Sequence, residues 1–393
     1  MPVYLPDRYN PQMLADEGYI ETEELLGDMI ADIESVYGIA YNEMLTKAKK
    51  YLTWFVAADN LKRKLVENKE MSISDYKHWR NTYMFQGRQT YAMLETLSAD
   101  LVNSDKIAAS IINGYMPEVY AINGNYITYA IEKATNINIA WTLFDEPTVE
   151  RLIREKPDLL PKAKVNIPDD MRWNKEKLTS ALTQGIIQGE NIDEIAERLA
   201  EVTDMDKTAA VRNAATMTTS AQNAGRVDGM KRAEDMGIKL KQRWLATLDG
   251  HTRETHRKCD GELREIGKKF SNGLLYPGDP NGPPAEVFNC RCVITSMVEN
   301  QLNDFSDRNN QLQGMTYDQW KESKGGEPLF KAARNENRDY KMHEEYRKLL
   351  GKRVPNTLAG FQDLKYKNPD AWRKMVSDAR KARNAKRKAA KNG

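Results

Sequence analysis

Soft metal ligands are concentrated in one short segment of this 393-residue chain. All three cysteines, Cys259, Cys290 and Cys292, lie in it, and two of the four histidines, His251 and His256, stand just before them. Thiolate and imidazole groups are the usual ligands of a structural zinc ion, and four such groups complete a tetrahedron. The segment is therefore a candidate zinc site with these five residues as candidate ligands.

The spacing of these ligands allows them to converge but leaves an alternative open. Two residues separate His256 from Cys259, so both side chains can face one side of a turn. Cys290 and Cys292 would face the same side of an extended strand, although zinc sites usually have two or more residues between paired cysteines. The alternative is that all three cysteines are reduced and pack as small buried apolar side chains.

Two catalytic interpretations of the segment have less support. Asp249, His251, His256 and Asn289 have the residue types of a His–Asn–His metal-dependent hydrolase, but the histidine expected on a helix after the asparagine is missing. A cysteine nucleophile would need a lowered thiol pKa and a neighbouring base, and the sequence does not show which cysteine would be activated. We therefore expect no enzymatic activity, with a metal-dependent nuclease or effector-type enzyme as the alternative.

The two arginines of the segment are expected to be structural clamps. Arg253 lies near Asp249 and Asp260, and Arg291 lies near Glu286. Forked guanidinium–carboxylate pairs could fix the loop to its neighbouring helix and strand. Substrate binding by these arginines is the less favoured alternative.

Other residues of the segment indicate turns and a small core. Asp249 can cap its own turn through its carboxylate, and Trp244 is expected to fill the core. The stretch Tyr276–Pro284, which includes Pro277, is rich in proline and glycine. Because proline fixes φ and glycine reaches unusual φ values, we expect a loop of fixed shape here.

The pattern D-G-H-T-R-x-x-H, followed by P-x-x-x-x-x-N-C-R-C, resembles the minor head protein family of tailed phages, often called the phage Mu F-like or head morphogenesis family. The resemblance is close over residues 175–298, and farther along only the phrase MTYDQW (Met315–Trp320) is similar. Cys259 departs from the family pattern, in which an apolar residue is more usual. The matching positions are Trp244, Asp249, Thr252, Arg253, His256, Gly261, Phe270, Pro277, Gly278, Pro280, Gly282, Asn289, Cys290, Arg291 and Cys292.

The resemblance implies a minor capsid protein of low copy number at the portal vertex, which acts in head morphogenesis and in DNA packaging or delivery. It implies the portal protein and a major capsid or scaffolding protein as partners, with the host cytoplasm as the place of assembly and the virion as the final location. Some family members have effector domains after the F-like segment. Here the region after residue 298 is polar and lacks a catalytic constellation, which argues against a fused effector.

Composition and charge exclude several classes of protein. No apolar stretch is long enough to span a membrane, and Met1–Asn10 does not have the pattern of a secretion signal. Three cysteines, an odd number, favour a reducing compartment over a disulfide framework.

The net charge of +2 is unevenly distributed along the chain. Residues 373–393 contain nine Lys or Arg and one Asp, a charge of +8, so the remainder carries −6. Such a tail could contact DNA phosphates, or it could be the solvated end of a helix. The candidate DNA contacts are Arg380, Lys381, Arg383, Lys386, Arg387 and Lys388.

The elements that position the segment are expected to be mainly helical, in an α+β fold. We expect an N-terminal helical domain over residues 1–160 and a small mixed α/β F-like domain over 173–300. A polar helical region with the basic tail would follow over 301–393. Prolines between residues 156 and 172 indicate the boundary between the first two parts.

In the N-terminal part, residues 1–15 are expected to form an extended arm. Apolar residues then step by three and four from residue 17 to about 66, which predicts a long helix, and Met71–Asp75 has the features of a second helix start. Asn103–Asp105 indicates a break. The turn signals at Asn113-Gly114 and Asn123–Asn125 predict either a hairpin or another helix over 126–135.

In the F-like part, we expect a helix from Trp173 to Gly189. A second helix should begin at Asn191 as its N-cap, with Glu194 three residues later in a capping-box arrangement. A stripe of small residues from Ala210 to Ala224 predicts a third, buried helix that ends at Gly237. Lys239–Thr247 and Cys292–Ser296 are the predicted strands, with a long ordered loop between them over 270–290.

Overall fold

The computed structural model describes most of the chain. The described residues are 10–86, 88–135, 143–144, 146–156, 158–188, 190, 192–298, 314–324, 342–343, 346–357, 360–361, 364–365 and 369–389.

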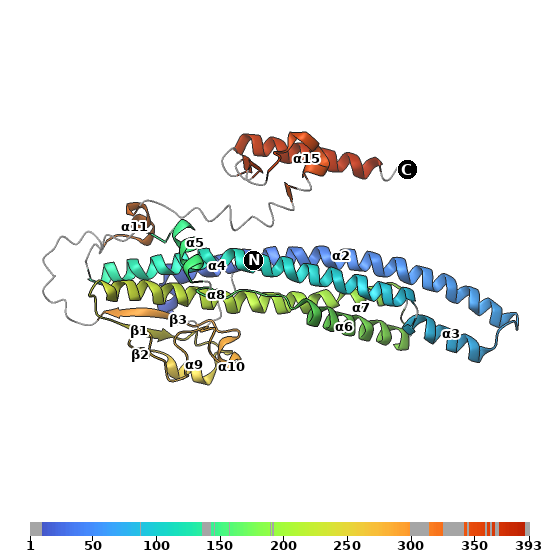
Figure 1. Cartoon of the computed structure of the whole chain (residues 1–393), viewed down its shortest axis with the longest axis horizontal. Helices are drawn as coiled ribbons and strands as arrows, with labels where there is room; N and C mark the ends of the chain where they lie inside the picture. The colour runs from blue at the N-terminus through green and yellow to red at the C-terminus, as the bar shows by residue number, and fades with distance from the viewer. Residues whose placement is uncertain are drawn as a thin grey trace.

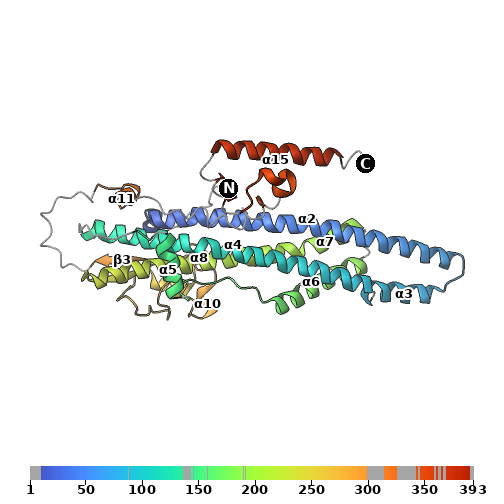
Figure 2. The ribbon, with the colours of Figure 1, turned by 45° about the horizontal axis from the view of Figure 1, so that its top comes forward.

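Long helices dominate the structure and run side by side along its longest dimension (Figures 1 and 2). Helix α2 alone has 51 residues, which corresponds to a length of about 75 Å at 1.5 Å per residue. The sheet lies along one end of α8, while α3 lies at the opposite end of the bundle (Figure 1). The bundle helices are α2 (Glu17–Glu67), α3 (Ile73–Gln86), α4 (Arg88–Thr135), α6 (Ile167–Gln188), α7 (Ile192–Ala200) and α8 (Val202–Asp235).

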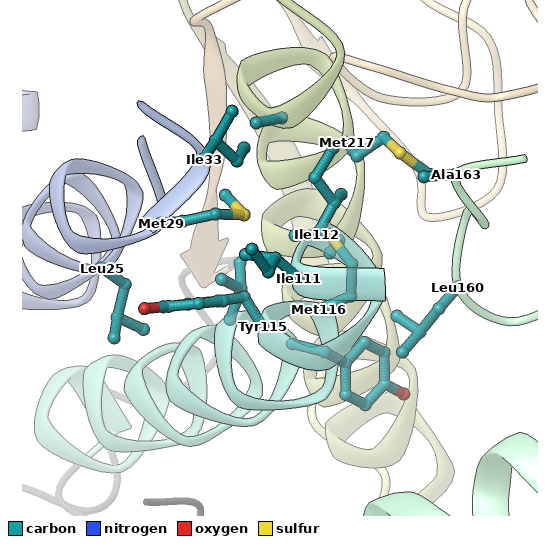
Figure 3. Close-up of a cluster of buried hydrophobic side chains, with 14 of the residues drawn as sticks. Leu25, Met29, Ile33, Ile111, Ile112, Tyr115, Met116, Leu160, Ala163 and Met217 are labelled. Atoms are coloured by element: carbon teal, nitrogen blue, oxygen red, sulfur yellow. The ribbon is translucent and has the colours of Figure 1, made fainter. Parts of the chain in front are cut away.

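The main core lies where α2, α4 and α8 meet (Figure 3). Met29 and Ile33 of α2 are fully buried against Ile112 of α4 and Met217 of α8. The helix expected over residues 17–66 is therefore confirmed, and its periodicity is explained by this packing. The second helix start is also confirmed, because the Ser72 hydroxyl accepts the Asp75 amide at 3.0 Å just before α3 begins.

The predicted break at Asn103–Asp105 and the possible hairpin after it are wrong, because these residues belong to the uninterrupted helix α4. The apparent turn residues make contacts between elements instead. The Asn123 amide donates to the Thr22 hydroxyl at 2.7 Å, and Asn113 exchanges two hydrogen bonds with the backbone of Ala163. Tertiary packing thus overrides the local preference of these residues.

Helices α4 and α8 approach each other closely enough to exclude side chains. A Cβ atom on Gly225 would lie 2.3 Å from the Tyr120 carbonyl oxygen, and one on Gly229 would lie 2.3 Å from Ile127 Cγ2. The prediction of a buried helix with a small-residue stripe is confirmed. Its predicted end is confirmed as well, because Gly237 has φ +88° and its amide donates to the Glu234 carbonyl.

Two predicted boundaries need correction. The helix expected from Trp173 begins earlier, at Ile167, because Pro168 lies in its first turn, where a missing N–H costs nothing. Residues 10–15 are not an extended arm, since Pro11–Leu14 forms the short helix α1; residues 1–9 lie outside the described part. The predicted cap at Asn191 also lies outside it.

The sheet has three antiparallel strands in the order β2-β1-β3. They are β1 (Leu240–Leu245), β2 (Leu263–Arg264) and β3 (Val293–Val298). The two predicted strands are confirmed, although β3 begins one residue later than expected, and the sequence did not predict the two-residue strand β2. The mainly helical α+β fold class is therefore confirmed. The division into three domains stays a prediction.

Shorter elements complete the described structure. They are α5 (Glu146–Glu155), α9 (Glu254–Cys259), α10 (Pro284–Val287), α11 (Tyr317–Ser323), η1 (Gly351–Arg353) and α15 (Pro369–Ala389). The MTYDQW phrase forms α11, which a Thr316–Gln319 capping box begins and which Trp320 anchors to Glu132 of α4 at 2.6 Å. Among the described helices, none combines the length and the apolarity that a membrane span requires.

A partly open acidic pocket of about 170 Å³ lies between the bundle helices. Its lining includes Asp105, Asp170, Asn174 and Asp206. Burial, together with the charges of Asp105 and Asp170, raises the pKa of Asp206 to about 8. Burial likewise raises the pKa of Asp105 to about 6. Both groups therefore hold a proton in the folded protein over a pH range in which they would be ionised in the unfolded chain.

This pocket predicts that the protein loses stability as the pH rises. Because the pKa of Asp206 is raised from its ordinary value of 3.8 to about 8 in the folded protein, the stability that its proton provides is fully present below pH 4 and is lost as the pH rises to 8. Asp206→Asn should make the free energy of unfolding fall less steeply with pH and raise it at pH 8 by about 1 kcal/mol or more. Urea unfolding at several pH values measures this free energy. Asp204 is exposed on the same helix, so the control Asp204→Asn should show the wild-type dependence of unfolding free energy on pH. The same dependence in Asp206→Asn as in the wild type would refute this explanation.

Candidate metal centre

The outer edge of β3 is bound by side chains of α8 rather than by another strand. Thr219, Asn223 and Arg226 share one helix face, because their spacings of four and three residues match the helical repeat. Their hydrogen bonds run from Thr219 Oγ1 to the Cys290 carbonyl (2.5 Å), from Asn223 Nδ2 to the Cys292 carbonyl (3.2 Å) and from Arg226 Nη1 to the Ile294 carbonyl (3.1 Å). The Ile294 amide also donates to Asn223 Oδ1 at 2.9 Å. We call these three residues the α8 polar ladder.

Arg226 links the ladder to the N-terminal helices. Its side chain is fully buried and makes a two-pronged pair with Asp16, at 2.6 and 2.7 Å. Its Nε donates to Asn123 Oδ1 at 2.8 Å. Asp16 in turn caps α2 by accepting the Tyr19 amide. One guanidinium group thus connects α2, α4, α8 and β3.

Beside the ladder, the structure brings together three of the five candidate ligands. His256 Nδ1 lies 3.5 Å from Cys290 Sγ and 3.5 Å from Cys292 Sγ. One ligand atom from each residue lies within 4.8 Å of the others, and all three residues are buried. Cys290 and Cys292 point to the same side, as expected for two residues at positions i and i+2 of extended backbone. His256 comes from α9, where its ring packs edge-on against Trp244 at 5.2 Å.

The other two candidate ligands lie apart from this cluster. Cys259 is buried, and its Sγ lies 3.2 Å from the Ser271 hydroxyl. Burial raises the pKa of the Cys259 thiol. His251 is exposed on the turn before α9. Neither belongs to the group of side chains close enough to share an ion among the described residues.

A carboxylate holds the far side of His256. Glu286 Oε2 lies 3.0 Å from His256 Nε2 and accepts a hydrogen bond from the Thr255 hydroxyl at 2.8 Å. The contact to His256 lies off the N–H direction of a linear hydrogen bond, so it acts mainly through charge. The carboxylate therefore lies at the ring nitrogen that does not face the two sulfurs, where it can orient the imidazole.

The two clustered thiols differ in character. A hydrogen bond from Cys290, together with His256 and the Thr247 amide, outweighs burial and lowers the pKa of Cys292. Burial and the neighbouring Cys292 sulfur raise the pKa of Cys290. The pair therefore favours a thiolate at Cys292 that accepts a hydrogen bond from the Cys290 thiol.

The turn before α9 is fixed by Asp249. Its Oδ1 accepts the His251 amide and the Thr252 hydroxyl, both at 2.9 Å, which is the self-capping turn expected from the sequence. Its Oδ2 lies 2.5 Å from Arg291 Nη1. Burial would raise the pKa of Asp249, but the bonds from Thr252 and His251 and the charge of Arg291 outweigh it and lower that pKa.

The arginine clamps exist, but with partners other than those expected. Arg291 pairs with Asp249 instead of Glu286, and Arg253 donates to the Phe288 carbonyl instead of a carboxylate. Sequence proximity suggested the wrong partners because the chain folds back between α9 and β3. Both arginines still join the α9 turn to the segment that carries the two cysteines.

The remaining motif residues shape the backbone. Trp244 is fully buried. Gly261 has φ +77° and donates its amide to the Trp244 carbonyl at 2.8 Å. Pro277 is buried in the loop, and a Cβ on the next residue, Gly278, would lie 2.9 Å from the Ser220 amide nitrogen. Asn289 has φ +55°, a conformation that asparagine tolerates better than most residues.

Sequence reasoning did not identify four residues of the site. They are Glu286 as the partner of His256, and Thr219, Asn223 and Arg226 of the α8 polar ladder. The only available signal was the run of polar residues in a helix that was otherwise expected to be buried. A polar side chain on a buried face needs a partner, but the sequence does not show that the partner is a strand edge.

The candidate DNA contacts all fall within α15, which is helical as expected. Lys381 is exposed. The side chains of the other five lie outside the described part: Arg380, Arg383, Lys386, Arg387 and Lys388. The helix packs near its start, where Met375 and Ala379 join a small core with Tyr346 and Phe361.

The structure is thus a long helical bundle that carries a small sheet and a Cys/His cluster. Residues 176–295 match the family described as Phage Mu protein F like protein. The minor head protein GP7 of Bacillus phage SPP1 is 21% identical over 291 residues, which cover 72% of this chain and 87% of that protein. This chain therefore carries a segment of the Mu F-like family of phage minor head proteins.

Two further relatives are longer than the matched region. The NAD(+)–arginine ADP-ribosyltransferase EFV of Enterococcus faecalis is 27% identical over 239 residues, or 58% of this chain and 48% of that protein. An uncharacterized protein of Haemophilus influenzae is 26% identical over 219 residues, or 55% and 45% of the two chains. The chain thus spans about half the length of these two relatives. No solved structure matches it significantly.

The polar ladder predicts a large effect of one buried amide. Asn223→Leu keeps the side-chain volume but leaves the Ile294 amide and the Cys292 carbonyl without their partner, which should cost about 1–3 kcal/mol of unfolding free energy. Chemical denaturation measures the loss. The control Asn213→Leu, exposed on the same helix, should change stability by less than about 0.5 kcal/mol. Equal effects in both variants would show that the ladder does not stabilise the fold.

Proposed function

We propose that this chain is a minor head protein that binds the portal protein at the portal vertex of a tailed phage. In this role it acts in head morphogenesis and in DNA packaging or delivery, and it remains in the virion. The observation that supports the proposal is the extent of the similarity to the minor head protein of phage SPP1. That similarity spans 291 residues, more than twice the length of the Mu F-like segment.

The fold offers a physical reason for a similarity of this extent. The Mu F-like segment shares its main core with α2 and α4, and Arg226 joins it to Asp16 at the start of α2. The bundle and the segment therefore form one packed unit. Its long helical surface suits contacts with several subunits of a ring or shell, such as portal, major capsid or scaffolding subunits.

Head assembly tests the proposal directly. The chain is co-expressed with the portal, scaffolding and major capsid proteins of the same phage, and heads are purified by sedimentation. We expect the chain in the head fraction at low copy number, and we expect less DNA to be packaged when it is deleted. Heads assembled without portal protein are the control and should lack the chain. Absence from heads that contain portal protein would contradict the proposal.

We further propose that the chain is not itself an enzyme. The named activity of the enterococcal relative belongs to a protein of which this chain matches 48%. The nuclease alternative would need Asp249 in its site, but Asp249 is paired with Arg291. Among the described residues, the one group of His, Cys and acidic side chains close enough to share a metal ion is His256, Cys290 and Cys292. Nicking of plasmid DNA, or transfer of ADP-ribose from NAD⁺ to arginine, by the purified chain would refute this view.

We also propose that the basic end of α15 contacts phage DNA. The support is that residues 373–389, which belong to this continuous helix, contain eight Lys or Arg and one Asp, a charge of +7. A helix concentrates these cations at 1.5 Å per residue, and neutralising DNA phosphates releases counterions.

Charge neutralisation tests the tail better than truncation, because Met375 and Ala379 belong to a small core. Replacing Lys381, Arg383, Lys386, Arg387 and Lys388 by Gln should weaken DNA binding. It should also reduce the slope of log K against log salt by about 0.9 for each lost phosphate contact. Fluorescence anisotropy with duplex DNA measures the slope. A control with Lys62 and Lys64 of α2 replaced by Gln should keep it; an unchanged slope in the tail variant would exclude the tail as the contact.

A further inference from the structure

The distances within the Cys/His cluster match those between ligands of one tetrahedral zinc ion. With Zn–S bonds of about 2.3 Å and Zn–N bonds of about 2.0–2.1 Å, a sulfur and a nitrogen on the same ion are about 3.5 Å apart. His256 Nδ1 lies 3.5 Å from each of the two cysteine sulfurs. The ligand atoms thus require little movement to receive an ion.

The surroundings of the cluster also suit a metal ion. Metal-bound histidines usually place their second nitrogen against a carboxylate, and Glu286 lies 3.0 Å from His256 Nε2. Two thiolates and one neutral imidazole cancel the charge of a divalent ion, so the centre can be buried without a net charge.

We propose that His256, Cys290 and Cys292 bind one zinc ion through Nδ1 and the two Sγ atoms, and that Glu286 positions His256. The fourth position is taken by a water molecule, because Cys259 is engaged with Ser271 and Asp249 with Arg291. A set of two sulfurs and one imidazole favours zinc over harder ions such as Mg²⁺. Binding releases the thiol protons and ties α9 to the start of β3.

Metal content tests the proposal with a matched control inside the chain. The full-length protein is purified under reducing conditions, incubated with zinc, dialysed and analysed for metal. We expect about one zinc per chain in the wild type, and loss of zinc in Cys290→Ser and Cys292→Ser. Cys259→Ser changes an equally buried cysteine outside the cluster and should retain the ion. Equal zinc in Cys290→Ser and wild type, or none in either, would overturn the proposal.

A second measurement remains informative if the cysteine variants do not fold. Addition of zinc to the metal-free wild type should raise its melting temperature, since a ligand bound only by the native state stabilises it. Glu286→Gln should fold and bind zinc roughly 10–100-fold more weakly. Cobalt in place of zinc should give the absorption bands of a tetrahedral thiolate site. A melting temperature unaffected by zinc, or unchanged affinity in Glu286→Gln, would contradict the zinc centre or the role of Glu286, respectively.

Discussion

The edge of a β-strand presents amide and carbonyl groups that need partners when they are buried, and in this protein a helix supplies them. Thr219, Asn223 and Arg226 satisfy the outer edge of β3 and of the residues just before it. The spacing of the donors on the helix suits the spacing of the acceptors on the strand. The seven residues from Thr219 to Arg226 advance about 10 Å along the helix, and the four residues from Cys290 to Ile294 advance about 13 Å along the extended chain. The α8 polar ladder therefore fixes which residues of β3 face which part of α8, and the other features of the Mu F-like segment depend on this register.

The register has consequences in both directions from the ladder. Toward the loop, it holds the carbonyls of Cys290 and Cys292, so both sulfurs face His256 on α9. Toward the N-terminus, Arg226 requires an anion in the core, and Asp16 provides it at the beginning of α2. A buried ion pair costs desolvation energy and contributes less to stability than its geometry suggests. Its main effect here is to select one arrangement of α2, α4, α8 and β3, and loss of either partner would leave a buried charge.

The sequence predicted the elements whose signal is local. The apolar repeat of α2, the glycine end of α8 and the two longer strands could be identified because propensity and pattern agree there. The prediction failed in α4, since Asn113 and Asn123 have turn propensity but use their amides between helices. In the site, the spacing paired Cys290 with Cys292, but it also paired His256 with Cys259, which faces Ser271. Glu286 and the polar ladder depend on contacts between residues distant in sequence, which a single sequence does not reveal.

The central claim is that the N-terminal helices and the Mu F-like segment form one cooperative unit through Arg226. Native-state hydrogen exchange of the intact chain at increasing denaturant tests it most directly. The account predicts that amides at the start of α2, in the middle of α4 and along β3 converge on one opening free energy. In Arg226→Met, which removes the shared charge, all three should lose protection together. Opening of β1 and β3 at a distinctly lower free energy, with α2 and α4 still protected, would contradict the claim.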